Sequence, residues 1–178
     1  MNKKCQVFTP QDYVEKILDD VGYISDLYGK KVLENSCGDG NILAKVVERY
    51  IADGKANGLS KSKIKKGLKK DIVGIEIDKE QSKKCIDRLN TILENNGIPI
   101  LEWKIHTEDY LKYHLNEKFD FVVGNPPYIT YSEMKEVDQK FLRDSFESCK
   151  KGKFDYCYAF IEKSLQDLSV NGKMAYLI

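Results

Sequence analysis

Short apolar segments alternate with amphipathic helical segments along the whole chain, and this alternation is what most constrains the fold. Apolar runs of strand length cover residues 31–34, 71–77, 100–105, 119–123 and 173–178. Apolar residues at helical spacing cover residues 11–20, 42–51, 79–93, 132–148 and 154–168. Strands that alternate with helices in this way form a parallel sheet with helices on both faces. The sequence therefore predicts a doubly wound, mostly parallel α/β fold.

The composition indicates one soluble domain, because the chain has 178 residues of which 42% are hydrophobic. The net charge is +1, with 29 basic and 28 acidic side chains, so there is no strong overall field for attracting nucleic acid. The five cysteines show no Cys-x-x-Cys spacing, which argues against a zinc site or a disulfide framework and favours a reducing cytoplasm. No apolar run has membrane-spanning length, so we expect neither secretion nor membrane insertion.

Two polar segments interrupt the alternation. Residues 54–70 are rich in lysine and glycine and are expected to form a surface insert. Their lysines could contact phosphate groups, but aromatic and arginine partners are missing, so a solvated helix face is the favoured interpretation. Residues 129–153 follow the fourth predicted strand and end in Lys150-Lys151-Gly152-Lys153. A polar segment of this length beside a site is often functional.

The first two predicted strands end in residues suited to binding a ligand. In an open α/β sheet, ligands bind outside the carboxyl ends of the strands. The first strand runs into Glu34-Asn-Ser-Cys-Gly38-Asp-Gly40, where two glycines allow a tight turn and a close backbone approach. The second strand ends in Glu76, where a carboxylate could meet a ribose diol. Each signal alone is weak, since the glycines could serve packing and Glu76 could be an ordinary acid at a helix start.

The third and fourth predicted strands are followed by two further motifs. Thr107-Glu108-Asp109-Tyr110 offers a carboxylate for an exocyclic amine and a ring that could cover a purine, although by itself it reads as a polar loop. Asn125-Pro126-Pro127-Tyr128 follows the fourth strand and is the strongest signal in the chain. Neither His106 nor His114 has a partner acid at a telling spacing, so we expect surface positions for both.

The tetrapeptide suits the chemistry of an amino group attached to an aromatic ring. Such a nitrogen is a poor nucleophile because its lone pair is delocalised into the ring. The side-chain oxygen of Asn125 and the carbonyl of Pro126, held in an extended turn by Pro127, could accept both N–H bonds and return the lone pair to nitrogen. Tyr128 offers a flat face for a base removed from the duplex. No metal and no covalent enzyme intermediate is required.

Taken in order, these motifs resemble the S-adenosylmethionine-dependent amino-methyltransferases of restriction-modification systems, in the group whose cofactor motifs precede the recognition region. The resemblance implies a Rossmann-like class I methyltransferase fold, S-adenosylmethionine as cofactor, and methyl transfer to N6 of a flipped adenine in DNA. The implied catalytic residues are Asn125, Pro126, Pro127 and Tyr128. The implied cofactor contacts are Phe8, Thr9 and Pro10 at the methionine part; Glu34, Ser36, Cys37, Gly38 and Gly40 in the glycine loop; Glu76 at the ribose; Ile77, Asp109 and Tyr110 around the adenine; and Phe160 from a later helix.

The chain departs from this family in two places. Asn35 stands where the family more often has proline after the acid, which we expect to be tolerated because the acid and the glycines remain. The chain also stops at the fifth predicted strand, whereas the family continues with two more strands, a second base-stacking aromatic residue and a DNA-recognition domain. We therefore expect residues 1–178 to be an incomplete catalytic domain, with the recognition domain on the same polypeptide or on a separate specificity subunit.

Three alternative functions remain open at this point. Methyltransferases that modify glutamine in protein release factors share the tetrapeptide, but they carry a helical domain before the glycine loop that has no room here. RNA base methyltransferases are a second alternative. The third is a non-catalytic scaffold that binds the cofactor and needs a partner to act.

Overall fold

The computed structural model describes residues 11–178 as a succession of helices and strands. The elements, in chain order, are α1 (Gln11–Val21), β1 (Val32–Glu34), α2 (Asn41–Ala56), α3 (Lys61–Asp71), β2 (Ile72–Glu76), α4 (Lys79–Asn95), β3 (Lys104–Thr107), β4 (Phe119–Gly124), η2 (Tyr131–Glu133), α5 (Glu136–Ser145), η3 (Glu147–Cys149), α6 (Tyr156–Asp167) and β5 (Leu168–Tyr176).

The strands form one five-stranded sheet in the order β3-β2-β1-β4-β5, and every neighbouring pair is parallel. β1 is central, with Leu33 opposite Val73 of β2 on one side and Val122 of β4 on the other. All residues of β1 and β2 are buried, as expected for strands covered on both faces. The predicted parallel sheet is confirmed. Because β2, β1 and β4 are parallel neighbours, their carboxyl ends lie at the same edge of the sheet.

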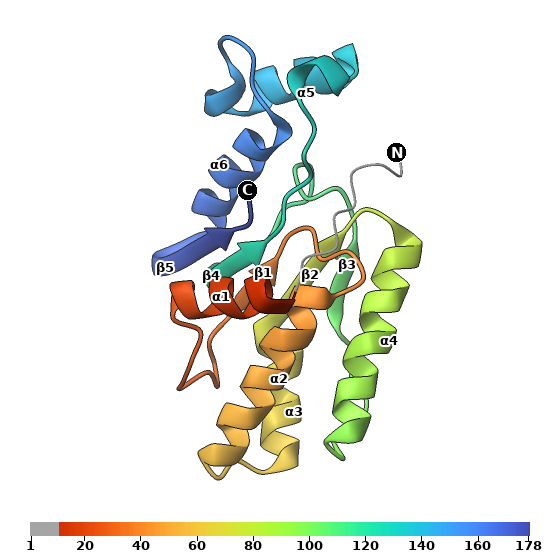
Figure 1. The fold of residues 1–178 in the computed structure, drawn as a ribbon, viewed down its shortest axis with the longest axis vertical. Helices are drawn as coiled ribbons and strands as arrows, with labels where there is room; N and C mark the ends of the chain where they lie inside the picture. Colours follow the sequence, from red (N-terminus) through yellow and green to blue (C-terminus); the bar gives the residue numbers. More distant parts are fainter. Residues whose placement is uncertain (1–10) are drawn as a thin grey trace.

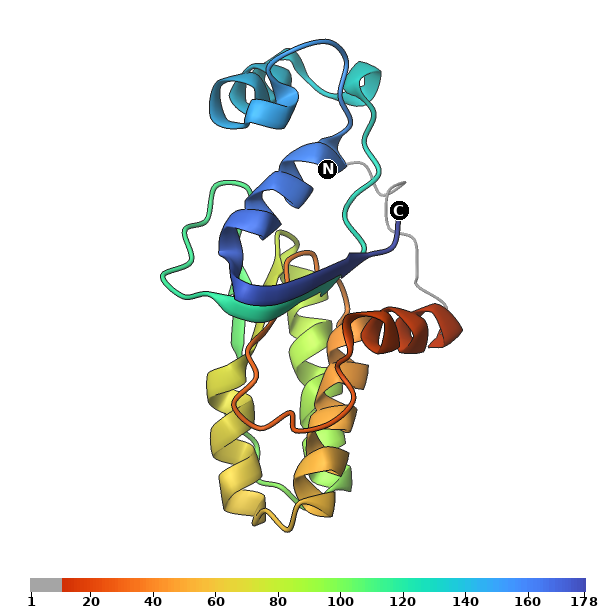
Figure 2. The same cartoon turned by 90° about the vertical axis from the view of Figure 1, so that its left-hand side faces the viewer.

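Helices cover both faces of the sheet, as predicted (Figures 1 and 2). Helices α1 to α4 pack on one face, where their apolar residues form a core with Val32, Ile72 and Val123. Helix α6 covers the other face, where Phe160 packs in a second core that includes Leu33. Between residues 11 and 178, no helix combines the length and apolar character that crossing a membrane requires.

The third and fifth strands begin at other positions than predicted. β3 starts at Lys104 instead of residue 100, because Leu101 and Trp103 enter the core from irregular backbone. The indole Nε1 of Trp103 donates to Asn90 of α4 at 2.9 Å, which fixes this approach. β5 starts at Leu168, directly after α6, and its pairing with β4 is irregular between Phe119 and Phe121. Apolar content alone therefore misplaced both starts.

The lysine-rich insert is part of the helical layer. Helix α2 continues to Ala56, and α3 starts after Ser60, whose side chain accepts from the backbone N–H of Lys63 at 3.3 Å. Ile64 and Leu68 of α3 are fully buried against the core. The lysines of α3 form the expected solvated face, and this face is the outer side of a helix whose inner side is packed against the core.

The predicted helix 132–148 is divided into η2, α5 and η3 within a segment, residues 129–154, that we call the arm. Met134 and Lys135 are extended, with ψ of 143° and 150°, so the helical path breaks there. One arginine holds the arm together: Arg143 donates to the carbonyls of Lys150 at 3.2 Å and Gly152 at 2.8 Å. Its guanidinium also lies 5.3 Å from the ring centre of Tyr131, a cation–π distance.

Candidate functional site

The glycine loop, residues 35–40, contacts the ends of both strands that flank β1. The backbone N–H of Gly38 donates to the Glu76 carboxylate at 2.9 Å. On the other side, the Ser36 hydroxyl donates to the main-chain carbonyl of Asn125 at 3.1 Å. The structure therefore brings together the predicted cofactor loop, the predicted ribose acid and the predicted catalytic tetrapeptide.

The two glycines of the loop serve different purposes. Gly40 precedes α2 with φ of 85°, and a Cβ there would lie 2.6 Å from the sulfur of Cys85. Both the backbone angle and the packing thus require glycine. Gly38 has φ of 51°, and a Cβ built on it meets no atom of residues 11–178 within 4 Å. The backbone at Gly38 is therefore open to a ligand.

Glu34 and Cys37 support the loop from below. Glu34 is 2% exposed, and its carboxylate accepts from the backbone N–H of Leu43, in the first turn of α2, at 2.9 Å. Burial raises the pKa of this carboxyl well above its usual range. The Cys37 thiol lies in the core, and its hydrogen bond with Cys85, together with burial, raises its pKa well above the usual thiol value. The contacts of both side chains are with the protein interior.

Glu76 is held at the end of β2 by two backbone donors. One carboxylate oxygen accepts from Gly38 and the other from Asp78, both at 2.9 Å. The following residue, Ile77, is 47% exposed, which is unusual for an isoleucine at the end of a buried strand. A fixed carboxylate beside an exposed apolar side chain suits a ligand that combines a diol with a flat ring.

The tetrapeptide Asn125–Tyr128 directly follows β4. The preceding Gly124 leaves little space for a side chain, since a Cβ would lie 3.2 Å from the Asn35 side-chain oxygen and 3.3 Å from the Tyr176 ring. Tyr128 is 42% exposed, and its hydroxyl donates to the Leu177 carbonyl at 3.0 Å. The turn is thus packed at its start and exposes an aromatic ring at its end.

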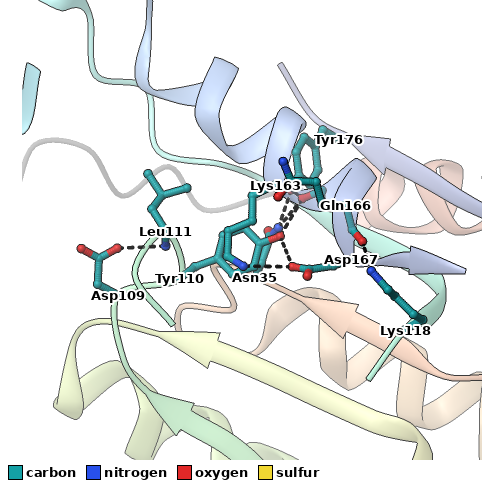
Figure 3. A network of polar contacts seen from close by, with 10 residues as sticks. Asn35, Asp109, Tyr110, Leu111, Lys118, Lys163, Gln166, Asp167 and Tyr176 are labelled. Atoms are coloured by element: carbon teal, nitrogen blue, oxygen red, sulfur yellow. Dashed lines mark hydrogen bonds and ion pairs between the residues drawn. The ribbon is translucent and has the colours of Figure 1, made fainter. Parts of the chain in front are cut away.

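The predicted cofactor contacts Tyr110 and Phe160 have a different place in the structure. Both rings are in the core beneath α6, with exposures of 2% and 5%, and their centres are 5.2 Å apart. The Tyr110 hydroxyl donates to Asp167 at 2.8 Å (Figure 3). In the described structure these residues lie behind the site, so their contact with a cofactor stays a prediction.

Asp109 lies at the edge where the prediction put it. Its carboxylate accepts from the backbone N–H of Leu111 at 3.1 Å and pairs with Lys112 at 3.2 Å. The predicted N-terminal contacts, Phe8, Thr9 and Pro10, lie outside the described residues.

Sequence reasoning missed a group of polar residues behind the site. In the sequence, Asn35 is unusual only in standing where proline is more common, and no motif points to Ser164 or Tyr176. Asn35 donates to both, at 2.8 and 2.5 Å. These contacts depend on the pairing of Gly124 with Tyr176 between β4 and β5, and no local pattern in the sequence encodes that register.

Comparison with known proteins places this site in a family. Residues 25–178 match the family model described as Eco57I restriction-modification methylase. The type II methyltransferase M.BstVI of Geobacillus stearothermophilus is 32% identical over 180 residues, which cover 94% of this chain and 32% of that protein.

Solved structures show the same fold. The methyltransferase subunit of a type I restriction-modification system from Streptococcus thermophilus has a TM-score of 0.63 at 21% identity, covering 98% of this chain and 35% of that one. A Listeria monocytogenes protein described as a class I S-adenosylmethionine-dependent methyltransferase has a TM-score of 0.60 at 18% identity, covering 100% and 48%. The chain spans about a third of the length of its curated relatives. It has the class I methyltransferase fold and belongs to the Eco57I restriction-modification methylase family.

Proposed function

We propose that this chain binds S-adenosylmethionine and carries the catalytic centre of a DNA methyltransferase that modifies N6 of adenine. The observation that carries the proposal is the contact between Ser36 of the glycine loop and the carbonyl of Asn125, which fixes the tetrapeptide beside the predicted cofactor loop. The names of the relatives support methyl transfer, since M.BstVI and M.PaeR7I are both type II methyltransferases.

The residues at the sheet edge fit the proposed cofactor. Glu76 would bind the ribose hydroxyls through its carboxylate, which is already oriented by two backbone N–H groups. Ile77 would contact the adenine, and Asp109 would accept from its amine. The open backbone at Gly38 leaves room for the ligand to approach. When bound, S-adenosylmethionine supplies a methyl group activated by its sulfonium charge.

The chain itself would activate and orient the target amine. The side-chain oxygen of Asn125 and the carbonyl of Pro126 would accept the two N–H bonds, which localises the lone pair and stabilises positive charge developing on nitrogen. Pro127 restricts the turn, and the Ser36 hydroxyl fixes its first carbonyl. A turn restricted in this way would reduce the reorganisation that the transfer requires.

The flipped base would stack on Tyr128. Its ring is exposed, and its hydroxyl is anchored to Leu177, so the position of the outer end of the ring is set before a base arrives. Sequence readout would come from a recognition domain on the same polypeptide or on a specificity subunit. A cytoplasmic location is proposed with it, because chromosomal DNA and reduced cysteines belong to that compartment.

Replacing Asn125 by alanine separates binding from chemistry. In the natural full-length protein, the variant should bind S-adenosylmethionine within about twofold of the wild type but transfer methyl at least about a hundredfold more slowly, because one pre-aimed acceptor is lost. Calorimetry gives the affinity and single-turnover transfer to unmethylated DNA gives the rate. Asn116→Ala, at an exposed position, is the control and should change neither.

A near-normal transfer rate in the Asn125→Ala variant would remove this residue from catalysis. The same assay, run with labelled cofactor and with DNA, RNA or release-factor protein as the acceptor, identifies the class of substrate. Label recovered as N6-methyladenine in DNA supports the proposal, whereas label in RNA or in a glutamine side chain replaces it.

A further inference from the structure

A buried chain of polar groups connects Asn35, just after β1, with α6 and β5 (Figure 3). The Asn35 amide donates to Ser164 at 2.8 Å and to Tyr176 at 2.5 Å. Ser164 and Tyr176 are 2.5 Å apart, and Ser164 lies 3.1 Å from the Tyr110 hydroxyl. Asn35 and Ser164 are almost completely buried, so the bond between them is shielded from water.

The carboxylate at the end of this chain sets the direction of every bond. Asp167, which lies 3.4 Å from the Lys163 ammonium, can only accept, so Tyr110 donates to it. The Tyr110 oxygen can then accept from Ser164, and Ser164 in turn accepts from Tyr176. Because the Ser164 proton is donated to Tyr110 and the Tyr176 proton to Ser164, both hydroxyls can only accept from Asn35.

This direction fixes the orientation of the Asn35 amide. Both of its N–H bonds must point to Ser164 and Tyr176, so its oxygen must point the other way. That oxygen is buried and has no hydrogen-bond partner in the part of the chain that the structure describes. It lies 3.2 Å from the place a Cβ on Gly124 would occupy, directly ahead of Asn125.

We propose that Asn35 is a positioning residue for the tetrapeptide Asn125–Tyr128. The polar chain locks its amide, and the locked amide and the Tyr176 ring form the wall against which Gly124 packs. This wall sets the point at which the backbone leaves β4, while Ser36 fixes the next carbonyl. The inference rests on the proposed function, because it assigns Asn35 to the geometry of that site. It gives Asn35 a role that the more usual proline could not perform, since proline has no side-chain donor.

The first test does not depend on activity. In Asn35→Ala, the backbone N–H signals of Gly124 and Asn125 and the side-chain amide signal of Asn125 should shift in nitrogen–proton NMR spectra. Tyr176→Phe keeps the ring but removes the hydroxyl, so it should move the same signals in the same direction by less. Asn90→Ala is the matched control, because it removes another part-buried asparagine bond, to Trp103, on the far side of the sheet.

The second test measures methyl transfer to unmethylated DNA by the full-length protein. Asn35→Ala should lower the single-turnover rate about ten- to a hundredfold, as a misplaced catalytic group does, and leave cofactor affinity within about threefold. Asn90→Ala should leave the rate unchanged. If folded Asn35→Ala and Tyr176→Phe proteins leave the Gly124 and Asn125 signals in place, the inference is wrong. If the signals shift but the wild type methylates no DNA, the positioning stands and the proposed function fails.

Discussion

Glu34 and Glu76 end neighbouring strands, yet their carboxylates meet different surroundings. Glu34 is enclosed beneath the glycine loop with one backbone donor, and burial raises its pKa. Glu76 receives two backbone donors beside the exposed Ile77. Glu34 therefore holds the loop on α2, whereas Glu76 is the acid that we propose for the ligand.

The raised pKa of Glu34 predicts a pH-dependent stability. The folded state holds the Glu34 proton more tightly than the unfolded state does. The contribution of this carboxyl to the free energy of unfolding is therefore complete below the unfolded pKa of about 4.3, and it falls as the pH rises toward the folded pKa. Glu34→Gln keeps an acceptor for Leu43 but does not ionise. Its free energy of unfolding should match the wild type near pH 4 and exceed it increasingly as the pH rises above the unfolded pKa.

Urea unfolding at a series of pH values measures this difference. Glu48→Gln is the control, because Glu48 is exposed on the same helix that Glu34 caps. If the unfolding free energies of Glu34→Gln and the wild type differ by the same amount at every pH, the pKa of Glu34 does not change on folding.

At the residue scale, the convergence of the candidate site residues could be predicted, and the burial of Tyr110 and Phe160 could not. Glu76 and Asn125 follow apolar strands, and the carboxyl ends of parallel strands meet at one edge, so their convergence follows from the pattern. Tyr110 occupies an equivalent position, but its ring turns under the sheet to meet Asp167 and Phe160. That turn depends on α6, which lies more than 40 residues further along the chain.

Among the elements, the arm depends most on a single side chain. Its core is a set of aromatic rings with little regular structure around them, and Arg143 supplies bonds to several carbonyls in the turn that closes it. A planar guanidinium can satisfy carbonyls in several directions at once, which an ammonium cannot.

Arg143→Lys should therefore loosen the arm although the charge remains. We expect the free energy of unfolding to fall by about 2 kcal/mol, the scale of a charged hydrogen bond that leaves its acceptors unpaired. Backbone hydrogen exchange in residues 149–152 should quicken before the rest of the fold is affected. Lys140→Met, which removes an exposed pair with Asp144 on the same helix, should change neither. Unaltered exchange in Arg143→Lys would show that the arm is held by its rings alone.

The elements themselves were largely predictable, because the change between strand and helix periodicity is strong in this sequence. The arm was not, since its apolar residues have helical spacing while Met134 and Lys135 adopt extended backbone. The start of β3 was missed because Trp103 and Leu101 are apolar for reasons of packing and not of strand formation. Tertiary contacts override local preference in both cases.

On the scale of the whole molecule, the two lysine-rich segments lie at opposite ends (Figures 1 and 2). The arm, which ends in residues 150–153, continues from the tetrapeptide, whereas α3 is at the far end of the helical layer. A duplex placed over the tetrapeptide would lie near the arm and away from α3. The structure thus places the two lysine-rich segments at different distances from the tetrapeptide.

Neutralising each patch should have unequal effects on DNA binding. Replacing Lys150, Lys151 and Lys153 by glutamine should weaken nonspecific DNA affinity and flatten the plot of log affinity against log salt by about 2 to 3 units of slope. The same change at Lys61, Lys66 and Lys70 alters the net charge equally but should have much less effect. Fluorescence anisotropy with a labelled duplex at several salt concentrations measures both. Equal losses from the two triple variants would contradict this orientation of the DNA.

The bonds from Asn35 have a consequence for how the protein is made. Asn35 and Tyr176 are separated by 141 positions in the chain, and Ser36 and Asn125 by 89. Closing such long loops is slow, so these contacts form late in folding. At a synthesis rate of roughly 5 to 20 residues per second, Asn35 emerges from the ribosome seconds before Tyr176 does. A nascent chain can therefore assemble the layer of α2, α3 and α4 while the tetrapeptide turn is still without its wall, so the turn reaches its final position only when β5 joins the sheet.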